Sequence, residues 1–114
     1  MKCSEYLWKY IDLQARMGKT EGWSPERTQG ELRLAMEANG DTRIVSDTTG
    51  EAMTEREARS VLGRNEKALW DAYRDGSRAR FDLIVTGQQV RDDEYHDQKE
   101  AAEEADQEGE AAVE

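Results

Sequence analysis

The sequence has few of the residues that build a large core or a disulfide framework. Leu, Ile, Val and Phe together make up only 16 of its 114 residues, and there is one cysteine, Cys3, and one proline. This length suits one domain, not two. A single cysteine cannot form an internal disulfide and fits a reducing cytoplasm. The lack of any long apolar run or apolar leader predicts a cytoplasmic protein with no membrane partner.

Charge of one sign is concentrated at the C-terminal end. Residues 92–114 contain 11 acidic residues and one base, whereas residues 1–91 contain 15 of each sign, so the whole net charge of −10 lies in the last segment. Nearly all large apolar residues lie in the neutral part. We therefore predict a folded domain over residues 1–91 and, over 92–114, an acidic helix that frays into a disordered tail by Gly109.

Helix signals recur along the neutral part. Capping residues, apolar residues at helical spacing and glycine stops predict helices over residues 4–18, 25–38, 54–62 and 65–74, capped by Ser4, Ser24, Thr54 and Asn65. Thr54 and Glu57 have the spacing of a capping box. Gly18 and Gly63 are expected to end the first and third helices, with a loop over residues 19–23 after the first.

A β-hairpin is predicted between the second and third helices. The β-branched run over residues 42–46 is followed by an Asp-Thr-Thr-Gly turn and a short return strand over residues 51–53. The predicted fold is therefore α+β: a helix-dominated small single domain with one short β-hairpin and an acidic C-terminal helix.

Residues 80–86 fit two structures. Phe81, Leu83 and Val85 alternate as in a strand, whereas Phe81, Ile84 and Val85 share a helix face. The β-branched residues and the following Gly87 favour the strand.

The sequence has no motif for catalysis or for a nucleotide. Zinc-protease, serine-hydrolase and dinucleotide-binding patterns are missing, and so is any Cys–His cluster. Asp92, His96 and Glu100 recur at helical spacing, but a solvated helix face explains them better than a metal site. We expect a protein that is not an enzyme, with no cofactor and no metal.

Residues 54–74 superficially resemble a helix-turn-helix motif. Gly63 lies in the turn, but Arg59 and Arg64 occupy positions where that motif takes small or apolar residues. A chain with a net charge of −10 is also repelled by DNA. A small transcriptional regulator is therefore the alternative function, and direct nucleic-acid binding is not expected.

The acidic end has three interpretations. On a helix, one face carries four carboxylates at a spacing close to that of phosphates along a nucleic-acid strand: Asp93, Asp97, Glu100 and Glu104. This stripe fits a basic groove of a protein or nucleoprotein partner. It is alternatively a solubilising tail, or it folds back on arginines of the same molecule, namely Arg56, Arg59, Arg74, Arg78 or Arg80.

Aromatic residues at the edges of the predicted apolar faces favour a partner. Exposed tryptophan beside arginine is typical of interface hot spots, which makes Trp8, Trp23, Trp70 and Arg59 candidate contacts together with the stripe. Partial core burial is the alternative for each tryptophan.

Small size, an acidic end and surplus aromatics are typical of phage or mobile-element inhibitors of host defence, such as anti-CRISPR and anti-restriction proteins. The function predicted is steric blocking of a nucleic-acid or effector site.

Overall fold

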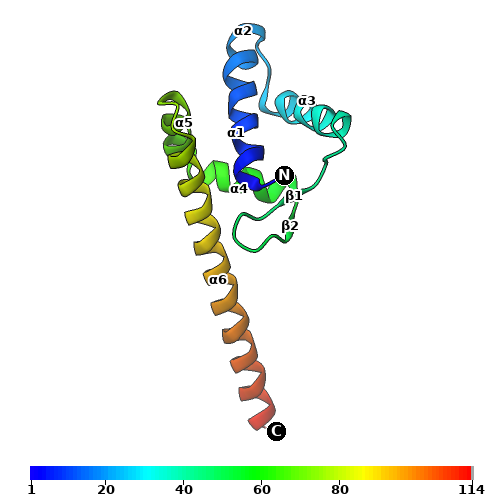
Figure 1. Cartoon of the computed structure of the whole chain (residues 1–114). Coiled ribbons are helices and arrows are strands. Elements are labelled where there is room, and N and C mark those ends of the chain that lie inside the picture. Colours follow the sequence, from blue (N-terminus) through cyan, green and yellow to red (C-terminus); the bar gives the residue numbers. More distant parts are fainter. Residues whose placement is uncertain (114) are drawn as a thin grey trace.

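The computed structural model describes the backbone of residues 1–113 and the side chains of residues 1–96. Helix α1 (Cys3–Leu13) lies between α3 (Pro25–Ala38) on one side and α5 (Glu66–Arg74) with the start of α6 (Arg78–Val113) on the other (Figure 1). The rest of α6 extends from this body as an arm, and the molecule measures 64 × 29 × 23 Å. The predicted fold class, helix-dominated α+β with one short hairpin, is confirmed.

The first helical segment is longer than predicted. α1 continues without a break into the π-helix η1 (Gln14–Gly18) and then into α2 (Lys19–Glu21), so the predicted stop at Gly18 and the loop over residues 19–21 are wrong. A Cβ at residue 18 would lie 2.4 Å from Nε2 of Gln14, so this glycine serves close packing within the π-turn. The left-handed residue that ends the segment is Gly22, with φ of 69°.

The cap of α1 comes from another part of the chain. The prediction that Ser4 caps this helix is wrong, because the N-cap residue is Lys2 and its side chain makes no capping bond. Instead, the Asp47 carboxylate accepts hydrogen bonds from the backbone N of Ser4 (3.0 Å) and from its hydroxyl (2.6 Å). A carboxylate at a helix N-terminus satisfies free N–H groups and complements the helix dipole. The turn that contains Asp47 is thereby fixed to α1.

Helix α3 and the hairpin match their predictions. α3 begins after Ser24, whose hydroxyl accepts a hydrogen bond from the backbone N of Arg27 at 3.1 Å, and it ends at Ala38. Strands β1 (Ile44–Val45) and β2 (Ala52–Met53) pair antiparallel, with Ile44 opposite Met53.

Helix α4 (Glu55–Arg64) starts with the predicted capping box of Thr54 and Glu57, but it continues through Gly63 and ends at Asn65. The side chain of Asn65 does not cap α5, contrary to prediction. Its amide donates instead to the carbonyl of Val61 and to the side chain of Gln88 in α6.

Residues 80–86 are helical, so the predicted strand is wrong. Phe81 and Val85, four residues apart, are fully buried, whereas Leu83 is 73% exposed, as a helix requires and a strand does not allow. Contacts with α1 and α5 hold this face against the core. α6 also runs without a break across the predicted boundary at residues 91 and 92, and its backbone continues past Gly109 to Val113.

The core surrounds α1. Its fully buried Tyr6, Leu7 and Ile11 meet buried residues of the other helices, chiefly Val61, Leu69, Phe81 and Val85. The buried face of α3 consists of Thr28, Leu32 and Met36, whereas Ala35 is exposed. This arrangement fixes α4, the hairpin and the root of the α6 arm relative to one another.

Candidate functional site

A cleft of about 540 Å³ lies where the α6 arm leaves the body, and we call it the arm-base cleft. Three elements form its walls: the hairpin and its turn, α4, and the α6 segment that ends at His96. Its floor includes the apolar side chains of Ala52, Met53 and Val61. The polar residues around them are Ser46, Thr49, Glu51, Glu57, Ser60, Arg64, Gln89, Asp92, Asp93, Tyr95 and His96.

The inward face of α6 changes from apolar to polar at the cleft. Phe81 and Val85 pack into the core, and the next turns place Gln88, Gln89 and Asp92 on the same side. Gln88 and Gln89 are buried, so their amides need partners. Hydrogen bonds therefore replace apolar packing over this part of the helix.

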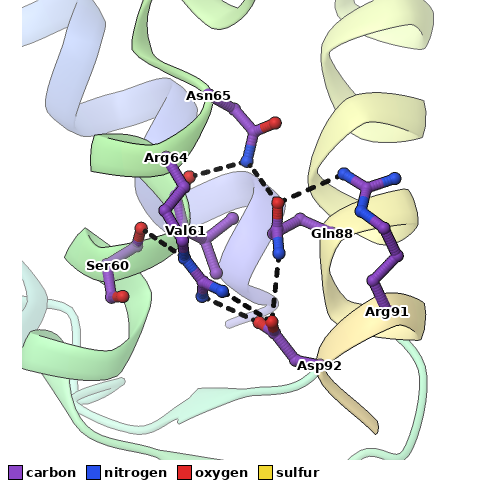
Figure 2. Close-up of polar contacts among 7 residues, drawn as sticks. All are labelled: Ser60, Val61, Arg64, Asn65, Gln88, Arg91 and Asp92. Atoms are coloured by element: carbon purple, nitrogen blue, oxygen red, sulfur yellow. Dashed lines mark hydrogen bonds and ion pairs between the residues drawn. The ribbon is translucent and has the colours of Figure 1, made fainter. Parts of the chain in front are cut away.

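Gln88 is at the centre of one polar network (Figure 2). Its Oε1 accepts hydrogen bonds from Asn65 at 3.0 Å and from Arg91 at 3.1 Å, and its Nε2 donates to Asp92 at 3.0 Å. Arg64 of α4 donates to both carboxylate oxygens of Asp92, at 2.6 and 2.9 Å. This bidentate pair links α4 to α6 at the cleft, and the planar guanidinium fixes the orientation of the two side chains relative to each other.

These bonds shift two ionisation equilibria. Partial burial of Asp92 opposes ionisation, but the hydrogen bonds from Arg64 and Gln88 outweigh it and lower the pKa of the carboxyl group. The same hydrogen bond, which Arg64 donates to Asp92, raises the pKa of Arg64. The pair is therefore charged at neutral pH.

A second network fixes the hairpin wall. The Gln89 Oε1 accepts from the backbone N of Asp47 at 2.8 Å, and its Nε2 donates to the Asp47 carboxylate at 3.2 Å. Since the same carboxylate caps α1 through Ser4, one residue of the turn links α1, the hairpin and α6. Thr48 adds a hydrogen bond from its hydroxyl to Asp93 at 2.7 Å.

The rim of the cleft is acidic and carries one exposed aromatic ring. Four carboxylates line it, those of Glu51, Glu57, Asp92 and Asp93, against one guanidinium and the imidazole of His96. Tyr95 is 63% exposed and contacts the His96 ring edge-on, with 5.9 Å between centroids. An acidic cleft with an apolar floor and an aromatic rim suits a basic side chain on an apolar stem.

Two of the predicted contact residues, Trp8 and Trp70, are partly buried and pack against the core. The Trp8 ring meets Tyr73 and Phe81 edge-on, at centroid distances of 5.2 and 5.1 Å, and Arg78 stacks on it at 5.4 Å. Trp8 is therefore partly buried against α5 and α6, which is the alternative stated for each tryptophan from the sequence. Trp70 also contacts Tyr73, with 6.0 Å between ring centroids, so both tryptophans belong to one cluster, and neither lines the arm-base cleft.

The other predicted contact residues are dispersed. Trp23 lies half-buried under Arg27, whose guanidinium is 4.7 Å from its ring, and Arg59 is hydrogen-bonded to Gln29 at the interface of α3 and α4. Asp93 alone lies at the arm-base cleft. The side chains of the remaining stripe residues, Asp97, Glu100 and Glu104, are outside the described residues.

Tyr95, Arg64 and Asp92 line the cleft, and the sequence alone did not single them out as candidate partner contacts. One signal was present in the sequence: Gln88, Gln89 and Asp92 continue the helical face of Phe81 and Val85. Reading residues 80–86 as a strand hid that continuity.

The described residues offer little other chemistry. No three His, Cys, Asp or Glu side chains among residues 1–96 are grouped as metal ligands, and the Glu100 side chain lies beyond that range. Burial, reinforced by the charge of Asp47, raises the pKa of the Cys3 thiol to about 12, so it stays protonated. In the described chain, no helix has the length and apolarity needed to cross a membrane.

Comparisons with protein-family models, with curated proteins and with solved structures found no match to this chain.

Proposed function

We propose that this protein acts by binding, without catalysis, to a basic segment of a protein or nucleoprotein partner. The observation that carries the proposal is the position of the arm-base cleft. It lies at the residues where the acidic segment begins, so the acidic lining of the cleft is followed directly in the sequence by the acidic residues of the arm. A partner that binds along the α6 arm would also contact the cleft at the base of that arm.

Charge supplies long-range attraction in this proposal. The net charge of residues 92–114 is −10, on a helix whose backbone continues to Val113. The neutral body adds no opposing net charge. A field of one sign on a projecting helix accelerates encounters with a surface of the opposite sign.

Tyr95 supplies the short-range contact. Interface anchors are aromatic residues that are exposed before binding and desolvated after it. Trp8 and Trp70 already pack against Tyr73, whereas Tyr95 is mostly exposed on the cleft rim. We therefore assign to Tyr95 the anchoring role that the sequence suggested for the tryptophans.

The consequence of such binding is competition with nucleic acid. An acidic helix that occupies a basic groove uses the lysines and arginines that otherwise contact phosphates. The proposed biological role is inhibition of a nucleic-acid-binding effector, in the manner of the phage and mobile-element proteins that block CRISPR or restriction systems. The alternative is a regulator that binds DNA through α4 and α5, although Arg64 is already paired with Asp92.

Site-specific photocrosslinking tests the proposal. A photoreactive amino acid replaces Tyr95 in one variant and Leu34 in a control, since Leu34 is equally exposed (59%) but lies on α3, away from the cleft. We expect a crosslinked host protein at position 95 that disappears at high salt, and none at position 34. Equal capture at both positions contradicts the proposal. A shift of a DNA duplex at low salt by the protein alone supports the regulator.

A further inference from the structure

A second cleft lies on an adjacent face of α4, and its charge is opposite to that of the arm-base cleft. It has a volume of about 550 Å³ and is lined by Gln29 of α3 and by Arg56, Arg59 and Ser60 of α4. None of these lining residues is acidic. Ser60 lies on the crest of α4 and borders both clefts.

Both arginines of this cleft lack an acidic partner among the side chains of residues 1–96. Most arginines of that range pair with a carboxylate, as Arg64 does with Asp92, but no carboxylate oxygen of the range lies within 4.0 Å of Arg56 or Arg59. Neither guanidinium group of the cleft therefore forms an ion pair with a described carboxylate, although the charge of Arg59 contributes to the lowered pKa of Glu55.

The neighbouring carboxylate, that of Glu55, already has hydrogen-bond partners on α3. Glu55 accepts hydrogen bonds from Arg33 through both of its oxygens and a third from Gln29. The bond from Arg33 is the main reason that the pKa of Glu55 lies below its usual value, although partial burial opposes the shift. Glu55 thus stays ionised in its pair with Arg33, and its hydrogen bonds come from Arg33 and Gln29, not from Arg59.

Gln29 orients Arg59. Its Nε2 donates to Glu55 at 2.5 Å, which fixes the amide so that its Oε1 faces α4 and accepts a hydrogen bond from Nη1 of Arg59. A guanidinium has five N–H donors, so this bond leaves most of them free. Arg56 and Ser60 lie one helical turn from each other on the same face of α4 as Arg59, because positions three and four apart are neighbours on a helix.

We propose that this cleft binds a phosphate group, with Arg56 and Arg59 as the charged ligands and the Ser60 hydroxyl as an additional donor. The charge and the number of acceptors favour phosphate over a carboxylate. A phosphate dianion balances two guanidinium groups and has enough oxygens to meet two bidentate forks, whereas a single carboxylate meets one. Apart from Ser60, which borders both clefts, this site uses residues that do not line the arm-base cleft, so its test is separate from that of the proposed partner-binding function.

A titration with sodium phosphate at constant ionic strength tests the proposal, with the arginine Nε–Hε signals followed by NMR. We expect saturable binding at one site that shifts two arginine side-chain signals. The double variant Arg56→Gln with Arg59→Gln should weaken binding at least about tenfold, since each lost fork removes a charge-assisted pair. Arg43→Gln is the matched control, because Arg43 is exposed and does not line the cleft.

Two further variants complete the test. Arg56→Gln alone leaves the bond between Arg59 and Gln29 intact, so it reports the loss of one ligand even if the double variant is poorly folded. Arg59→Lys retains the charge but loses the fork, and it should bind more weakly than the parent protein.

Non-saturating shifts, or equal affinity in the parent and double variant, overturn the site. Acetate binding as tight as phosphate overturns the assignment to phosphate. O-phosphoserine serves as a second probe: tighter binding than orthophosphate supports a phosphomonoester as the natural ligand, and weaker binding supports the free anion.

Discussion

Asp92 and its neighbours differ sharply in role although the sequence presents them as one run of acids. Asp92 is held by Arg64 and Gln88, Asp93 by Thr48, and Glu94 is exposed. The difference follows from helical position, since only residues that continue the face of Phe81 and Val85 reach α4.

The lowered pKa of Asp92 makes the stability of the fold depend on pH. A carboxyl group whose pKa is lower in the folded than in the unfolded state stabilises the fold above its ordinary value of 3.8, and this contribution is lost as the pH falls through the lowered pKa. We expect Asp92→Asn to reduce the free energy of unfolding by about 1–2 kcal/mol at pH 7, with a deficit that shrinks as the pH falls below the ordinary value of 3.8. Thermal melts from pH 2 to 7 measure it.

The control for this experiment is Asp75→Asn. Asp75 pairs with Arg80 at 2.7 Å but its side chain is 62% exposed, and such surface pairs contribute little to stability. A deficit for Asp92→Asn that stays constant across the pH range would show that shape, not charge, explains the effect.

Two glycines on exposed backbone provide a matched test of conformation. Gly50 has φ of 75° in the hairpin turn, whereas Gly30 is in the middle of α3, and a Cβ at either position meets nothing within 4 Å. Gly50→Ala should lower the free energy of unfolding by about 1 kcal/mol because an L-residue is strained there. Gly30→Ala should raise it by about 0.5–1 kcal/mol. Urea unfolding of both variants measures the opposite signs.

At the scale of elements, the sequence predicted best where the signals were local. The Ser24 cap and the Thr54 capping box start their helices as expected, and the turn ending in Gly50 forms the hairpin. Prediction failed where tertiary contacts decide. Gly18 and Gly63 lie inside helices, and residues 80–86 become helical because α1 and α5 bury Phe81 and Val85 together.

The candidate site was predicted only in part for the same reason. The acidic character of the surface follows from composition, and Asp93 was identified from its spacing. The cleft itself depends on Asp47 meeting Gln89, more than 40 residues away, and on Arg64 meeting Asp92. Local patterns contain no information on such pairings.

Two substitutions in α6 test experimentally whether residues 80–86 form a helix or a strand. In a strand, Phe81 and Leu83 would share one buried face, whereas the helix buries Phe81 fully and leaves Leu83 mostly exposed. Phe81→Ala should therefore reduce the free energy of unfolding by about 3–5 kcal/mol, and Leu83→Ala by less than about 0.5 kcal/mol. Comparable losses in urea unfolding would contradict the helical register.

At the scale of the whole molecule, the body and the arm meet at the arm-base cleft. Two truncations locate the boundary between them. A chain that ends at His96 retains the contacts of Asp92 and Asp93 with α4 and the hairpin, whereas one that ends at Arg91 loses both. We expect the longer chain to melt like the full protein and the shorter one to lose about 1–3 kcal/mol of unfolding free energy. Identical melting curves for the two truncations would place the boundary at Arg91.

Association kinetics with the crosslinked partner distinguish the role of the arm from that of the cleft. Replacing Asp93, Asp97, Glu100 and Glu104 together by their amides removes charge but keeps side-chain shape. This variant should associate more slowly and lose most of its salt dependence, because steering acts before contact and is screened as the Debye length falls from about 10 Å at 0.1 M salt. Tyr95→Ala should instead raise the dissociation rate and leave the salt slope unchanged, since a desolvated aromatic anchor acts after encounter. Surface plasmon resonance over a range of ionic strengths measures both rates. If the amide variant associates at the parent's rate at every salt concentration, the acidic arm is a solubilising segment and binding depends on the cleft alone.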